Sequence, residues 1–108
     1  MRKRTFLILG VVVTLCVVGV VGWFFFGDTI QEQTEQALRN VRAILEAAGT
    51  GLDRLVKTTV FLQNLDDFPG MNEVYKQHVG DQPPARSTVE VAKLPSGALV
   101  EIEAVALA

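Results

Sequence analysis

The sequence predicts an α+β domain in which two helices cover one face of a mixed sheet, preceded by one transmembrane helix. Three observations predict this architecture. An uncharged apolar run occupies residues 6–26, two later segments carry apolar residues at three- and four-residue spacing, and three short segments are rich in β-branched residues or alternate in polarity. After the apolar run the elements follow in the order helix, strand, helix, strand, strand. We therefore expect a basic cluster and transmembrane helix at 1–26 and one small domain at 27–108.

The apolar run has the length and flanks of a membrane-spanning helix. Its 21 residues would extend roughly 31 Å as a helix, which is the thickness of a bilayer's hydrocarbon core. Arg2, Lys3 and Arg4 precede the run, and Trp23 begins an aromatic cluster at its far end, as in membrane-interface belts. The sequence thus predicts a single-pass membrane protein with a cytoplasmic N-terminus and with membrane lipid as the partner of residues 6–26.

Two other interpretations of the run stay open. A cleaved signal peptide would have a shorter apolar region that ends in small residues, whereas this run ends in Trp-Phe-Phe-Phe. A fusion or a mispredicted gene start would make the run foreign to the domain. In that case the domain would be cytosolic.

The first helix of the domain is expected over residues 28–48. Asp28 and Gln31 have the spacing of an N-cap and its capping-box partner, and Gly49 suits the left-handed position that ends a helix. One face is predicted to be solvated by charged and amide side chains. The opposite face is apolar and comprises Ile30, Thr34, Ala37, Leu38, Val41, Ile44, Leu45 and Ala48.

A strand and a second helix follow. Leu55–Leu62 is rich in β-branched residues and is bounded by polar turns. Asp67 is placed to cap the next helix, and Pro69 falls in its first turn, where a missing N–H costs nothing. Met71 and Tyr75 belong to the apolar stripe of this helix and are interpreted as core or interface packing.

The last two strands are expected at residues 87–92 and 99–106, where side chains alternate with period two. The Leu-Pro-Ser-Gly sequence at 94–97 gives a turn between them. A simple antiparallel hairpin is the pairing that this arrangement suggests.

Composition narrows the classes of function. From Gly27 onward twelve acidic residues outnumber seven basic ones, and such a domain has no basic stripe for nucleic acid. Cys16 is the only cysteine, and His78 has no His or Cys near it in the sequence, so neither a disulfide framework nor a metal site is predicted. A domain of about eighty residues buries a modest fraction of its surface, which predicts self-association.

Three blocks of the domain, MNEVY, PARSTVEVA and EIEAVA, occur in an order and at a spacing that closely resemble the RidA/YjgF family. The resemblance extends over nearly all of the chain after residue 26. It implies a chorismate-mutase-like trimer that hydrolyses reactive imines and enamines of the 2-aminoacrylate type to 2-keto acids and ammonia. It also implies that neither a metal nor an organic cofactor is needed.

The resemblance assigns roles to four residues. Arg86 in PARSTVEVA matches the arginine that holds the substrate carboxylate, and its planar fork suits a bidentate grip. Glu101, the first acid of EIEAVA, matches the catalytic glutamate that orients the attacking water. Asn72 in MNEVY matches a position at the edge of the substrate pocket. Thr88 occupies a substrate-binding position at which many members carry a cysteine, so thiol chemistry is not expected here.

The sequence also departs from the family pattern. Family members begin with a further segment that contains two strands and contributes a tyrosine and a glycine to the pocket, and here the apolar run stands in its place. The sheet is therefore expected to lack those strands and to have an open edge. Three functions stay open: an imine deaminase, a non-catalytic membrane-tethered module that binds a metabolite or a partner, and a truncated gene product.

A hairpin of the last two strands would separate Arg86 from Glu101 by about 13 Å along the strands. One small substrate cannot reach both side chains within a chain of that register. We therefore expect a site assembled between neighbouring subunits of a homotrimer.

Overall fold

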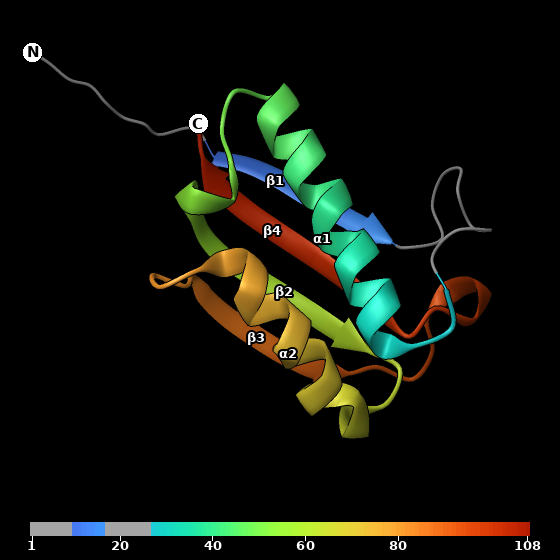
Figure 1. The fold of residues 1–108 in the computed structure, drawn as a ribbon. Helices are drawn as coiled ribbons and strands as arrows, with labels where there is room; N and C mark the ends of the chain where they lie inside the picture. The colour runs from blue at the N-terminus through green and yellow to red at the C-terminus, as the bar shows by residue number, and fades with distance from the viewer. Residues whose placement is uncertain (1–9, 17–26) are drawn as a thin grey trace, which may run out of the picture.

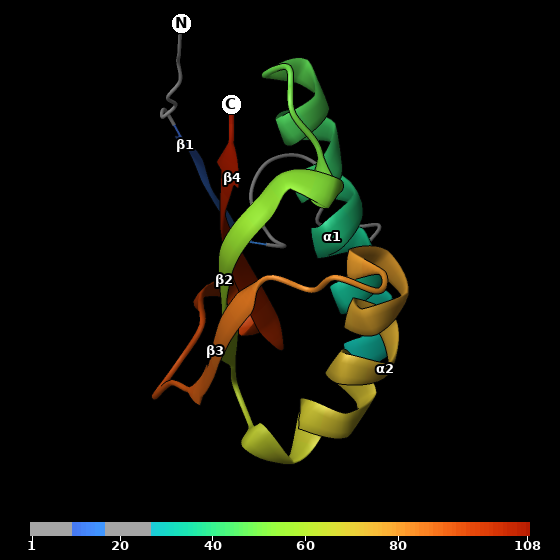
Figure 2. The same cartoon turned by 90° about the vertical axis from the view of Figure 1, so that its left-hand side faces the viewer.

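The computed structural model describes residues 10–16 and 27–108 and places two helices against one face of a four-stranded sheet (Figure 1). The strand order is β1-β4-β2-β3, with β2 and β3 parallel and the other neighbours antiparallel. Both helices lie on the same side of the sheet (Figure 2). The prediction of an α+β domain with two helices on one face of a mixed sheet is confirmed. The elements are β1 (Gly10–Cys16), α1 (Ile30–Ala47), β2 (Leu55–Leu62), α2 (Phe68–Val79), β3 (Ala85–Glu90) and β4 (Val100–Leu107).

The predicted transmembrane helix over residues 6–26 is wrong, because β1 lies within it. β1 runs antiparallel to β4, with Val13 opposite Ala104. A Val-rich run does not by itself distinguish a strand from a buried helix, and here the free edge of β4 offers it backbone partners. The rest of the predicted span, residues 6–9 and 17–26, lies outside the described residues.

No helix within residues 10–16 and 27–108 has the length and apolar character needed to cross a bilayer. The predicted single-pass membrane localisation, with lipid around residues 6–26, is therefore corrected. The expectation that no strand from this region joins the sheet is corrected as well, since β1 pairs with β4 from Gly10 to Cys16 and is the edge strand of the described sheet.

The N-cap of α1 lies one residue later than predicted. Thr29, not Asp28, is the N-cap residue, and its Oγ1 accepts a hydrogen bond from the N–H of Glu32 at 3.0 Å. The Glu32 carboxylate in turn accepts from the N–H of Thr29 at 3.2 Å, which completes a capping box. Two overlapping sequences, D-x-x-Q and T-x-x-E, satisfied the same pattern, and the second also brings a negative charge to the helix N-terminus. At the other end Gly49 has a φ of +87°, as predicted.

The core lies between the two helices and the sheet. Leu38 of α1 is 1% exposed, and Met71 of α2 is fully buried. Buried residues alternate with half-exposed ones along most of β2 and β4, so each strand turns one face to the helices and the other away from them. Ile44, which the helical spacing placed on the buried face of α1, is instead 43% exposed.

The predicted hairpin between the last two strands is wrong, because β2 lies between β3 and β4. β3 is an edge strand parallel to β2, with Arg86 opposite Thr58. The side chain of Gln63, just after β2, fixes the connection from β3 to β4. Its Nε2 donates to the carbonyl of Ala92 at 3.3 Å, and its Oε1 accepts from the N–H of Leu94 at 2.9 Å. These two bonds hold the segment between β3 and β4 against the end of β2.

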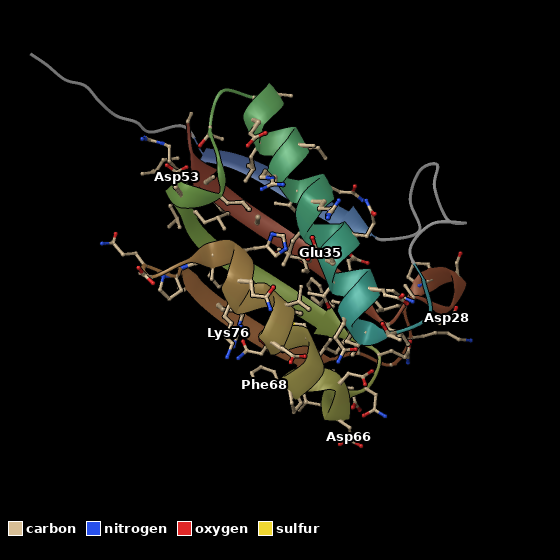
Figure 3. The ribbon with its side chains drawn as sticks, in the orientation of Figure 1. Asp28, Glu35, Asp53, Asp66, Phe68 and Lys76 are labelled. Atoms are coloured by element: carbon tan, nitrogen blue, oxygen red, sulfur yellow. The ribbon has the colours of Figure 1, made fainter. Side chains whose placement is uncertain are left out.

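A polar cluster joins the outer surfaces of the two helices. The carboxylate of Glu35 in α1 accepts a hydrogen bond from Arg39 Nε at 2.7 Å, and it lies 2.8 Å from His78 Nε2 in α2. The hydrogen bonds from Arg39 and then His78 lower the pKa of Glu35 below its ordinary value of 4.5. Glu35 projects from α1 toward α2 (Figure 3), and the ionised carboxylate therefore contributes to helix pairing.

We expect the contribution of Glu35 to stability to depend on pH. A pKa lowered by folding means that this contribution is fully present above pH 4.5 and is lost as the pH falls through the folded-state pKa. Glu35→Gln should therefore lower the free energy of unfolding more at pH 7 than at pH 3, as measured by urea denaturation. Glu46→Gln, at an exposed position of the same helix, is the control. Equal destabilisation by Glu35→Gln at both values would contradict the assignment.

Candidate functional site

The candidate site is built around Arg86, the second residue of the edge strand β3. Its Nη1 donates a hydrogen bond to Asn72 Oδ1 at 2.7 Å. Its guanidinium carbon lies 5.2 Å from the centre of the Phe68 ring and 4.6 Å from that of the Tyr75 ring. The three partners are four and three residues apart along α2, so one face of this helix provides all of these contacts.

These contacts leave part of the guanidinium available. Arginine carries five N–H donors in a planar fork, and the bond to Asn72 uses one donor. Neither ion pair found in residues 10–16 and 27–108 involves Arg86, and the side chain is half-buried. A partly desolvated fork with free in-plane donors suits a planar anion such as a carboxylate.

A hollow of about 320 Å³ lies beside Arg86. Lys76 also lines it, one helical turn after Asn72 on α2 (Figure 3). The lining residues include two cations and no carboxylate, so the hollow favours an anionic ligand. Its other lining residues are Tyr75, Val79, Gly80, Pro83 and Pro84.

Thr88 lies on the same face of β3 as Arg86, two residues further along the strand. It is opposite Val60, which is fully buried beneath the helices. Its hydroxyl oxygen is buried and has no hydrogen-bond partner among the described residues. Such a group is uncommon in folded proteins, and it places an unused donor and acceptor on the site's side of the sheet.

Glu101 lies on the opposite face of the sheet from Arg86. Its neighbours Val100 and Ile102 are fully buried toward the helices, so Glu101 points away from them. Across the sheet Arg86 is level with Ala104 of β4, three positions from Glu101. Three residues along a strand and two strand spacings each amount to about 10 Å. A single chain therefore brings together Arg86, Asn72 and Thr88 but not Glu101.

The sequence did not identify Phe68, Tyr75 and Lys76 as residues of the site. The available signal was their spacing from Asn72, which puts all four on one side of an amphipathic helix. The same spacing is common in ordinary core packing, and only the position of β3 beneath α2 distinguishes a site at Arg86 from core packing. No group of three potential metal ligands occurs in the part of the chain that the structure describes.

Comparisons with known proteins point to one family. The family model described as endoribonuclease L-PSP matches residues 11–108. A RutC family protein of Pyrococcus horikoshii is 52% identical over 80 residues, which are 74% of this chain and 63% of that protein. The human 2-iminobutanoate/2-iminopropanoate deaminase is 47% identical over 78 residues, which are 72% of this chain and 57% of the enzyme. The chain thus spans less than two thirds of the length of these relatives.

Solved structures agree with the fold. The crystal structure of yeast Mmf1 has a TM-score of 0.73 at 40% identity, covering 75% of this chain and 65% of that one. The crystal structure of E. coli TdcF with bound serine has a TM-score of 0.71 at 43% identity, covering 76% and 67%. Both similarities extend over about three quarters of the chain, so the arrangement of helices and strands is shared.

Proposed function

This chain belongs to the endoribonuclease L-PSP family, which is the RidA/YjgF family, and from that premise we propose that it is a hydrolytic deaminase of 2-imino and 2-enamino acids. The proposed substrates are of the 2-aminoacrylate type, and the products are a 2-keto acid and ammonia. The observation that carries the proposal is the state of Arg86, which is held by Asn72 and two aromatic rings and whose other N–H donors have no partner among residues 10–16 and 27–108.

In the proposed reaction Arg86 binds the substrate carboxylate through a bidentate contact. An enamine such as 2-aminoacrylate first tautomerises to the imine, as C3 gains a proton and the nitrogen loses one. Water then adds to the imine carbon, forming a C–O bond while the C=N electrons move to nitrogen. The carbinolamine then loses ammonia as the C–N bond breaks and the hydroxyl oxygen becomes the keto oxygen. Glu101 accepts one proton from the attacking water and passes it to the nitrogen, and it then transfers the proton of the carbinolamine hydroxyl to the same nitrogen, so that ammonia leaves with both protons of the water. Asn72 lines the hollow next to Arg86, and Thr88 lies on the same face of β3 two residues further along.

Arg86 and Glu101 can serve one substrate only if they come from different copies of the chain. They lie on opposite faces of one sheet and are offset along it. We therefore propose a homotrimer with a site at each subunit boundary. The sheet face away from the helices is suited to such contacts, since it carries Val89, which is 41% exposed, opposite the half-buried Phe61, and the half-buried Val105 further along β4.

The reaction is tested by generating 2-aminoacrylate from serine with a pyridoxal-phosphate dehydratase and following pyruvate release. Full-length protein should accelerate release above the spontaneous rate, and the effect should scale with protein concentration. Binding of pyruvate without any acceleration would contradict the deaminase proposal and favour a non-catalytic ligand-binding module. Degradation of RNA by the purified chain is not expected, because the domain after residue 26 has a net charge of −5 from twelve acidic and seven basic residues.

A further inference from the structure

A buried hydrogen bond connects β2 to α2 directly beneath the candidate site. Thr58 Oγ1 and Tyr75 Oη lie 2.6 Å apart, and either hydroxyl can donate. Thr58 is 1% exposed and Tyr75 is 3% exposed. Two hydroxyls in such a place satisfy each other, which fixes the tip of the tyrosine ring relative to the sheet.

The same tyrosine ring contacts Arg86. Thr58 is directly opposite Arg86 in the parallel pairing of β2 and β3, and the guanidinium carbon lies 4.6 Å from the centre of the Tyr75 ring. The ring is thus held at one end by Thr58 and supports the arginine on its face. Phe68 and Asn72 of the same helix also contact the guanidinium.

We propose that Thr58 and Tyr75 are positioning residues for the anionic grip of Arg86. The inference rests on the proposed function in one respect, namely that Arg86 binds the substrate carboxylate. An arginine side chain loses considerable rotamer freedom when it is ordered, and a site that orders it before binding does not incur that cost again for each substrate. The ring of Tyr75, which is fixed by Thr58, holds the guanidinium of Arg86 in the orientation in which it can bind a carboxylate.

The alternative is that the bond between Thr58 and Tyr75 only stabilises the core. The two roles differ in what happens to Arg86 when the bond is removed under conditions where the protein stays folded. If the bond only stabilises the core, its removal would lower the melting temperature and leave Arg86 ordered. If the bond positions Arg86, its removal would also let the guanidinium move.

The first measurement follows Arg86 itself by ¹⁵N relaxation of its Nε–H group in the full-length protein, with the signal assigned by its loss in Arg86→Lys. Thr58→Val and Tyr75→Leu should each lower the order parameter of this group, and Tyr75→Leu should do so more, because the ring is lost as well as the hydroxyl. Tyr75→Phe keeps the ring and should resemble Thr58→Val. The matched control is Thr34→Val, which removes a buried threonine hydroxyl of α1 that has no partner among the described residues.

The second measurement uses the 2-aminoacrylate assay. Loss of an interaction made equally with bound substrate and transition state raises KM and leaves kcat unchanged. We expect KM to rise about threefold in Thr58→Val and about tenfold in Tyr75→Leu, with kcat within about twofold of wild type. Thr34→Val should leave both constants unchanged.

The positioning role is overturned if Arg86 keeps its wild-type order in Thr58→Val and Tyr75→Leu, or if Thr34→Val disorders it equally. A disordered Arg86 with unchanged KM would overturn the connection to substrate binding. If the wild-type chain hydrolyses no imine, the proposed function fails, and the relaxation measurement still decides the positioning role by itself.

Discussion

Replacing Arg86 by alanine should lower kcat/KM for imine hydrolysis by about two to three orders of magnitude. A charged, hydrogen-bonded contact in a partly desolvated site is worth about 2–5 kcal/mol when one partner is removed, and Arg86 is half-buried against two aromatic rings. Arg86→Lys should recover little of the loss. An ammonium keeps the charge but cannot make the planar two-point contact or stack on Phe68 and Tyr75 in the same way.

The matched control for this prediction is Arg54→Ala, which removes an exposed arginine from the short helical turn Leu52–Arg54 before β2. It should leave kcat/KM unchanged, so that a general effect of net charge is separated from the contact at the site. Circular dichroism of each variant checks that the fold is retained. Activity in Arg86→Ala equal to that of Arg54→Ala would remove Arg86 from the site.

The sequence predicts the helices and the central strand well, because each has a local signal. Helical spacing and a capping pattern marked α1 to within two residues at its N-terminus, and the run of β-branched residues gave Leu55–Leu62 with both ends as found in β2. The family resemblance placed Arg86 and Asn72 at the same pocket, and their side chains form a hydrogen bond. The roles assigned to them in catalysis remain predictions.

The errors concern features that no local signal specifies. An apolar run without alternation fits a membrane helix or a buried strand, and only the free edge of β4 decides in favour of β1 for Gly10–Cys16. The parallel pairing of β3 with β2 goes with the crossover through α2, and the side chain of Gln63 then bridges to Ala92 and Leu94 in the connection to β4, contacts between residues distant in the sequence. The bond between Thr58 and Tyr75 depends on the packing of α2 against β2, which is again a contact between residues distant in the sequence. Local patterns therefore predicted elements, while their neighbours in the sheet had to come from the structure.

Mixing two inactive variants should restore activity. Arg86→Ala retains Glu101, and Glu101→Gln retains Arg86, so neither variant alone can form a complete site. If each site takes Arg86 from one subunit and Glu101 from its neighbour, a mixed oligomer contains some sites with both residues intact. Random assembly from equal amounts makes about one quarter of the sites complete in a closed ring with identical boundaries. Pyruvate release should therefore return to about a quarter of the wild-type rate after the two variants are unfolded and refolded together.

The geometry of one sheet makes this result specific. Arg86 contacts α2, whereas Glu101 lies on the face turned away from both helices. Glu101 is also three residues along β4 from Ala104, the residue that is level with Arg86. No rotamer change moves either side chain through the sheet, so a site within one chain would need a different fold. The two variants refolded separately and then combined without exchange are the control and should remain inactive. If the mixture refolded together is as inactive as this control, while wild type refolded in the same way is active, the proposal of a site shared between subunits is wrong.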